Sequence, residues 1–432
     1  MEAYSVSAIE LNKEQKEKKE KSNIVLFLAG KLVSLLGTYI YNFALSYYIL
    51  KVTGSGTSFA LSLFMGVLPR VVMGPFAGSI ADRFDRKKLV VGLDMLSGIV
   101  VLGMLGLSTI FGLSIVLIYA ANLLLAIINT FFNTTIAAAV PNLVSDKSLM
   151  KIMSYSETMN SLSGIAGPIL GGLIYATVSI ELFLLVNGIS FILSAISEMF
   201  IDFNFNKKDN STQDKPKRIT FKDFITDIKE VFVYIREKKA LYTILKYAIA
   251  LNFFIHVCLS VMLPYVVTNV LRMSSTQFGT IESAFPIGML VMSLIFARLP
   301  EREKKHTMLT VGIGANGLLI ILMGLPAFSF AGSWGINMIF GYYIVVCAVF
   351  AAFMIIVNVP LSTTSQRLIP DEIRGRAIGV LHSISGGVTP IGIILAGILV
   401  DIIPIWIAFF ISGLMVMLMA VGMHRNKHIK EF

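Results

Sequence analysis

The feature that most constrains this chain is a series of twelve apolar blocks spread over its 432 residues. Each block is long enough to cross the ~30 Å hydrocarbon core of a bilayer as a helix. Most blocks contain glycine or proline, which membrane helices accept more readily than soluble helices do. We therefore expect an all-α membrane protein with twelve transmembrane helices, and the predicted spans are 24–50, 57–81, 88–110, 113–138, 152–178, 180–203, 241–270, 276–298, 307–328, 333–360, 374–400 and 402–423.

The net charge of +10 reports membrane topology rather than a nucleic-acid partner. All but four of the 36 lysines and arginines fall in segments that twelve spans place on one side. Of the four exceptions, Lys51 and Arg272 lie in loops of the opposite side, and Lys31 and Arg70 lie inside predicted helices. Because cytoplasmic loops carry the excess of basic residues, we expect a plasma-membrane protein with both termini in the cytoplasm.

The polar segments divide the chain into five parts. Residues 1–23 alternate Lys and Glu with little apolar content, which favours a disordered cytoplasmic tail, and no cleaved signal peptide is predicted. Residues 24–203 and 241–424 each hold six spans, and 204–240 is a linker whose apolar residues recur at helical spacing. We expect an amphipathic helix there on the cytoplasmic membrane face, and a cytoplasmic tail over 425–432.

No cofactor is expected. The chain lacks a glycine-rich phosphate loop, a metal-binding histidine pair and a nucleophile motif. Both cysteines, Cys258 and Cys347, lie in predicted helices. An ATP-driven pump, a metal centre and an intramembrane enzyme are therefore disfavoured.

A charged loop between the second and third spans is the strongest local motif. Gly74 and Gly78 stand four residues apart, so they share one helix face and allow a neighbouring backbone to approach. The loop that follows holds Asp82, Arg83 and Arg86, and its charge places it at a membrane surface.

This stretch resembles the signature loop of the major facilitator superfamily. The resemblance covers 24–424 and implies two six-helix halves that work by alternating access. It also implies that the aspartate and arginines of the loop form a charge network that latches the halves on the cytoplasmic side. The loop with Arg374 and Arg376 is typical of the same family. The alternative is that these charges are ordinary snorkelling loop residues.

The fifth span carries the second motif, Gly167, Pro168, Gly171 and Gly172. Proline removes a backbone donor and the glycines allow bending and close packing. The motif is similar to the fifth-helix motif of drug–proton antiporters, and residues 67–70, 85–88 and Asp94 resemble the macrolide-efflux branch. The resemblance implies an ion gradient, most simply protons, as the energy source.

Two intramembrane acids, Asp94 and Glu282, are the candidates for proton coupling. A carboxyl group in a low-dielectric cavity can exchange a proton as access alternates. Structural pairing is the alternative for Glu282. Glu198 and Asp202, near the end of the sixth span, are expected at the membrane interface.

A further group of polar residues within helices could line a substrate cavity. A cation such as Lys31 or Arg70 inside a helix must face a cavity or a carboxylate, or snorkel to the headgroups. A lone histidine is more often a packing residue than a proton shuttle. The candidate cavity residues are Lys31, Tyr39, Asn42, Arg70 and His256.

The sequence thus predicts a secondary transporter that exports small amphipathic compounds, of the drug or macrolide type, by proton antiport. Its expected partners are a small-molecule substrate, protons and the lipid bilayer, and a single chain is expected to suffice. A lipid, siderophore or nutrient carrier of the same fold remains open, as does a non-transporting membrane sensor or scaffold.

Overall fold

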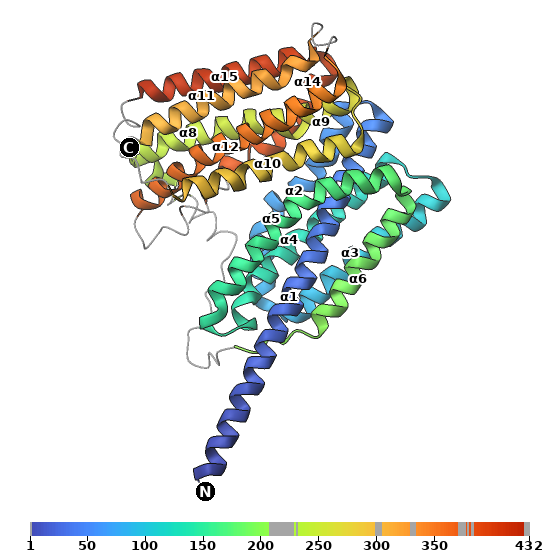
Figure 1. The fold of residues 1–432 in the computed structure, drawn as a ribbon, viewed down its shortest axis with the longest axis vertical. Helices are drawn as coiled ribbons and strands as arrows, with labels where there is room; N and C mark the ends of the chain where they lie inside the picture. The colour runs from blue at the N-terminus through green and yellow to red at the C-terminus, as the bar shows by residue number, and fades with distance from the viewer. Residues whose placement is uncertain are drawn as a thin grey trace. The chain divides into compact units, whose positions relative to one another are not determined.

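The computed structural model describes residues 2–206, 229, 232–298, 305–328, 334–369, 377, 380–381 and 384–426. Most of the expected linker helix, the 425–432 tail beyond Asn426, and both Arg374 and Arg376 lie outside these residues. Every regular element in the described part is helical, and Figure 1 follows the helices in chain order.

Six helices precede the linker, and their ends lie close to the predicted spans. Serine and aspartate side chains cap three of them. Asp85 accepts from the Lys88 N–H at 2.9 Å, and Ser114 and Ser179 cap the two helices that follow them. The helices are α1 (Glu2–Thr53), α2 (Gly56–Arg83), α3 (Arg86–Phe111), α4 (Ile115–Leu143), α5 (Asp146–Thr177) and α6 (Ile180–Met199).

The second half begins with one long helix that contains two π-helical segments. It runs through α8 (Lys239–His256), η1 (Val257–Met262), α9 (Leu263–Tyr265) and η2 (Val266–Val270). Single π-helical turns often occur at functional positions. The remaining helices are α10 (Ser275–Phe296), α11 (Lys305–Gly324), the short 3₁₀ turn Leu325–Ala327, α12 (Ile336–Leu368), α14 (Thr389–Ile402) and α15 (Ile405–Arg425).

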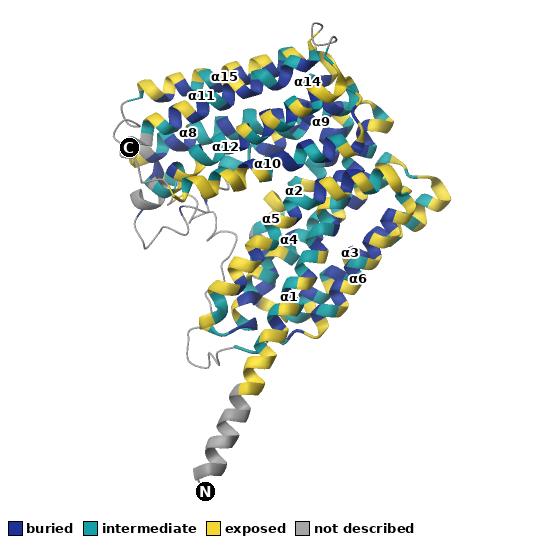
Figure 2. Cartoon of the chain, viewed as in Figure 1, coloured by how far each residue is buried: buried dark blue, intermediate teal, exposed yellow. Residues whose placement is uncertain are grey.

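Eleven helices of the described residues are long and apolar enough to cross a membrane. The expected fifth span coincides with α5, which is 32 residues long but carries several hydroxyl, amide and charged side chains. Many exposed side chains on the helices are large and apolar, as lipid contact requires. Figure 2 marks the exposed residues in yellow. The chain is therefore a multi-pass membrane protein.

The structure differs from the expected disordered tail, because α1 is continuous from Glu2. The alternation of Lys and Glu that suggested disorder also places opposite charges one turn apart. The Lys18 ammonium lies 3.1 Å from the Glu14 carboxylate at this spacing. Such pairs support a helix that has no apolar face to bury.

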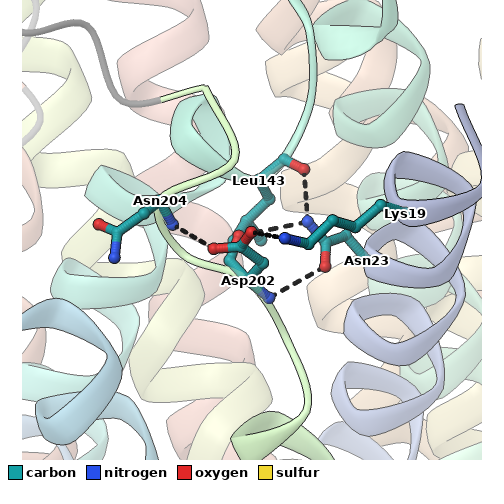
Figure 3. A network of polar contacts seen from close by, with 5 residues as sticks. All are labelled: Lys19, Asn23, Leu143, Asp202 and Asn204. Atoms are coloured by element: carbon teal, nitrogen blue, oxygen red, sulfur yellow. Dashed lines mark hydrogen bonds and ion pairs between the residues drawn. The ribbon is translucent and has the colours of Figure 1, made fainter. Parts of the chain in front are cut away.

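A polar network fixes the membrane end of this extension (Figure 3). The Asn23 side-chain amide donates to the carbonyl oxygens of Leu143 at 2.9 Å and Asp202 at 3.2 Å. The Lys19 ammonium lies 2.6 Å from the Asp202 carboxylate, which also accepts from the Asn204 N–H. This network ties α1 to the ends of α4 and α6.

The expected position of Asp202 at the membrane interface stays a prediction. Partial burial acts to raise the pKa of its carboxyl. The Lys19 ammonium and the Asn204 N–H act the other way and hold that pKa below its usual value. The carboxylate is ionised and anchored at neutral pH.

The chain forms two compact units, which do not follow the two sequence halves. Unit 1 comprises Met1–Tyr41, Val72–Gly167 and Val178–Arg218. Unit 2 comprises Asn42–Val71, Pro168–Thr177 and Ile219–Phe432. Unit 2 thus holds the last part of α1, the first part of α2 and the last part of α5 together with the second half, which sequence position alone does not indicate.

Candidate functional site

Within unit 1, α3 and α6 run side by side at a distance that only glycine allows (Figure 1). A Cβ atom on Gly98 would lie 2.9 Å from the Gly188 carbonyl oxygen and 2.7 Å from the Ile192 side chain. One on Gly188 would lie 2.7 Å from Leu102. This contact sets an antiparallel register that brings the start of α3 beside the end of α6.

The facing surfaces of α1 and α6 are equally small and polar. The Asn187 side-chain amide donates to the Gly37 carbonyl at 2.9 Å. One to two turns further, the Ser194 hydroxyl donates to the Gly30 carbonyl at 3.4 Å. Ser34 lies between the two glycines on α1 and is buried. The α1–α3–α6 seam is therefore polar inside a helix bundle whose outer faces are apolar.

Two carboxyl groups lie in this seam, and we call Asp94 and Glu198 the acid pair. Their side chains are 3% and 4% exposed. The Asp94 carboxyl lies within hydrogen-bonding range of the Ser34 and Ser194 hydroxyls and interacts electrostatically with Glu198. One oxygen of each carboxyl, Asp94 Oδ2 and Glu198 Oε2, is buried without a hydrogen-bond partner. Since buried polar atoms are almost always bonded, these two oxygens require an explanation.

The expected interfacial position of Glu198 is wrong, because the side chain is buried beside Asp94. Its place near the end of α6 suggested access to headgroups. The helix stripe on which it lies points instead into the bundle, together with Asn187 and Ser194. Those three residues recur at positions i, i+7 and i+11, one polar stripe on a helix, and that spacing was the available signal.

Lys31 is the cation of α1 closest in sequence to this seam. Its ammonium donates to the Ser156 hydroxyl of α5 and interacts electrostatically with Glu157. The side chain is half-buried rather than stretched to the headgroups. Lys31 is thus bonded within unit 1. None of the described bonds joins a cation to Asp94 or Glu198.

The second candidate acid, Glu282, lies in unit 2 on α10. Its side chain is half-buried and lies within electrostatic range of Cys347 on α12. His256 lies at the end of α8, where its Nδ1 is 3.4 Å from the Ser260 hydroxyl in the π-helical segment. These two residues belong to the other compact unit, so the structure does not relate them to the acid pair.

The motif between the second and third spans lies at the end of α2. A Cβ atom on either Gly74 or Gly78 would meet nothing within 4 Å. The Arg83 side chain is exposed, and Arg86 donates to the Ala138 carbonyl of α4 at 2.7 Å. Asp82 is the last residue but one of the same helix, and its side chain lies outside the described part. The latch expected here stays a prediction.

The Gly-Pro motif of α5 lies where the backbone makes very close contacts. A Cβ atom on Gly167 would meet the Tyr39 side chain, and one on Gly171 would lie 2.9 Å from Phe43. A Cβ atom on Gly172 would overlap the backbone of Ser275 at the start of α10.

Three further contacts continue the surface between α5, α1 and α10. The Ser275 hydroxyl donates to the Gly172 carbonyl at 2.8 Å. The Pro168 carbonyl lies against Gly279, and the Tyr47 hydroxyl donates to the Met273 carbonyl at 3.1 Å. Within unit 2, Pro168 and Gly172 thus pack closely against the second half, and Gly171 packs against Phe43 of α1.

A second junction between the sequence halves centres on Asp401, at the end of α14. Its carboxylate accepts from the Ser55 hydroxyl at 2.9 Å, the Gly56 N–H at 2.7 Å and the Thr57 N–H at 2.9 Å. These groups form the first turn of α2, where the helix dipole favours an anion. The sequence alone does not predict this cap, because Asp401 and its donors are more than 340 residues apart.

The remaining cavity candidates are the most exposed members of the set. Arg70 and Asn42 are exposed in unit 2, and Tyr39 of unit 1 is 39% exposed. None of the three takes part in the acid pair or in the Asp401 cap. Their expected role in lining a substrate cavity stays a prediction.

Comparison with known proteins identifies the family of this fold. The Major Facilitator Superfamily model matches residues 27–386 and 247–427. Macrolide efflux protein A of Streptococcus pyogenes is 23% identical over 393 residues, which cover 91% of this chain and 93% of that protein. Multidrug efflux pump Tap of Mycolicibacterium fortuitum is 25% identical over 411 residues, covering 93% and 95%.

Solved structures support the same fold at lower identity. A bacterial homologue of the iron transporter ferroportin, in an inward-facing state, superposes with a TM-score of 0.67 at 18% identity and covers 94% of this chain and 99% of its own. The nucleoside transporter NupG superposes with a TM-score of 0.66 at 14% identity, covering 95% and 100%.

Proposed function

The chain belongs to the Major Facilitator Superfamily, and on that premise we propose that it exports small amphipathic compounds by proton antiport. The similarity to macrolide and multidrug efflux proteins over nearly the whole chain supports the export of such compounds. The observation that carries the proton part of the proposal is the buried carboxyl of Asp94, which has an unpartnered oxygen inside a membrane helix.

In this proposal both termini lie in the cytoplasm of a plasma-membrane protein that works as a monomer. The Asp401 cap and the Gly172 contact then lie on the outer side, where they close access from outside. Opening would separate Asp401 from the first turn of α2 and Ser275 from Gly172. The Asp82, Arg83 and Arg86 loop would act as the latch on the opposite side.

The test uses purified protein in proteoliposomes with an internal pH dye. An imposed proton gradient and a panel of amphipathic drugs should give drug-dependent proton flux in wild type. Glu282→Gln and Asp94→Asn identify which acid carries the proton. If drugs exchange without any proton movement, antiport is wrong. If no compound on the panel moves or binds, the export of amphipathic drugs is wrong.

A further inference from the structure

The two orphaned oxygens of the acid pair mark a binding site that a single coupling acid would not need. We propose that Asp94 and Glu198 together form one proton-binding site in the α1–α3–α6 seam. The inference rests on the proposed function and deepens it, because it makes Glu198 a second coupling residue.

The electrostatics of the seam favour binding of one proton by the acid pair. Two carboxylates in one apolar, water-poor seam repel each other, and both lose most of their hydration. The neighbouring hydroxyls within range of Asp94 are those of Ser34 and Ser194, and Ser194 also donates to the Gly30 carbonyl. One proton added to the pair removes one of the two charges, and so relieves the repulsion at once. The remaining charge stays beside these hydroxyls.

The charged residues on the neighbouring helices favour the same conclusion. The helix α4 carries no acidic or basic residue between Ile115 and Leu143. On α1 the nearest cation is Lys31, which is bonded to Ser156. At the start of α3, Arg86 is bonded to the Ala138 carbonyl. Among the described ion pairs, none joins a cation to Asp94 or Glu198, and a proton neutralises one of the two charges instead.

The ligands available at the acid pair suit a proton better than a metal ion. No group of three or more His, Cys, Asp or Glu side chains that could hold a metal occurs among the described residues. Two carboxyl groups and two hydroxyls give a sparse ligand set for Na⁺ or a divalent ion. A proton needs a single oxygen, and each carboxyl offers one that is unpartnered.

Proton uptake and release at the acid pair involve one O–H bond. A proton from water forms an O–H bond with one carboxylate oxygen, and the pair changes from two negative charges to one. When access alternates, the O–H bond breaks and the proton returns to water on the other side. No oxidant, reductant or co-substrate takes part.

The test is a pH titration of the protonated-carboxyl infrared band in the full-length protein in lipid bilayers. All samples carry Glu282→Gln, so that this acid does not contribute to the band. Removing either partner removes a neighbouring negative charge. In Glu198→Gln, and separately in Asp94→Asn, the remaining acid should release its proton about one pH unit lower or more, a tenfold loss of proton affinity. The double variant should lose the band.

The matched control is Glu181→Gln, the same substitution at an exposed position at the other end of α6. It should leave the titration unchanged. The inference is overturned if Glu198→Gln leaves the midpoint where it was, since the two acids would then be independent. It is also overturned if the double variant keeps the band, or if Na⁺ added at constant pH removes the band from the protein that keeps both acids.

Misfolding is separated by measuring thermal stability in the same bilayers, because both substitutions are nearly isosteric. Failure of drug export and failure of the shared proton site give different results. If the midpoint shifts as expected but no drug on the panel moves, the proton site stands and drug export falls. If drugs move with protons and Glu198→Gln has normal coupling, export stands and the shared site falls.

Discussion

Asp94 and Asp401 are the same residue type in two regions of one molecule, and they meet opposite environments. Asp401 has three donors from the first turn of α2 and needs no further partner. Asp94 lies in a buried seam with one oxygen unpartnered and a second carboxyl beside it. A satisfied carboxylate anchors structure, whereas an unsatisfied buried one is available to bind something.

The largest effect is expected when Asp94 is neutralised. Asp94→Asn keeps the shape of the side chain and removes its capacity to take up a proton. We expect drug accumulation driven by a proton gradient to fall to the level of protein-free liposomes, while drug exchange without a gradient continues. Flux assays in proteoliposomes measure both. Accumulation close to wild type would show that Asp94 is only a packing residue.

The next largest effect is expected at the close contact of α5. Gly172→Ala places a methyl group on the Ser275 backbone, and overpacking of this kind costs about 1–3 kcal/mol. We expect the thermal midpoint to fall or the closed arrangement of unit 2 to become less populated. Gly164→Ala is the control on the same helix, because a Cβ atom there meets nothing within 4 Å. Equal effects of the two substitutions would contradict the close contact.

Removal of the Asp401 cap should have a smaller effect. Asp401→Ala takes away the acceptor for two backbone N–H groups of α2, and loss of such a cap costs about 0.5–2 kcal/mol. Hydrogen exchange should become faster at Gly56 and Thr57. Proton-gradient-driven accumulation should persist, unlike in Asp94→Asn. Complete loss of coupling in Asp401→Ala would reverse the roles assigned to the two aspartates.

The smallest effect is expected at the interfacial pair of Asp202 and Lys19. Because the pKa of Asp202 is lower in the folded than in the unfolded protein, its contribution is present at neutral pH and is lost as the pH falls below about 4. Asp202→Asn should lower stability at pH 7 by less than about 1 kcal/mol, as for other partly exposed pairs. Thermal midpoints at pH 7 and below pH 4 should differ less in this variant than in wild type. The exposed Glu17→Gln is the control.

Most of the fold was predictable, because the length of a hydrocarbon-crossing helix is set by the bilayer rather than by tertiary packing. The predicted 57–81 and 180–203 correspond to α2 and α6 within a few residues. Only α5 falls short of the hydropathy of a span, since its first turns carry charged and hydroxyl side chains. Residues 1–23 were expected to be disordered, whereas α1 begins at Glu2, because alternating Lys and Glu can support a helix as well as disorder.

The site was predictable only in part. Asp94 stood out because a carboxyl inside an apolar block is costly wherever the helix turns. Glu198 did not, because a position near a helix end is compatible with either headgroups or the bundle interior. Asp401 was missed for a different reason, since nothing local to 401 indicates that its donors lie at 55–57.

The sequence by itself therefore determined the membrane class, the positions of the helices, the family resemblance and one buried acid. Each of these follows from local composition and spacing. The tertiary structure alone decided which acid is satisfied and which is not. Hydrogen-bond partners come from helices far apart in the chain, and the glycine contacts at Gly98 and Gly188 set the register that brings Asp94 beside Glu198.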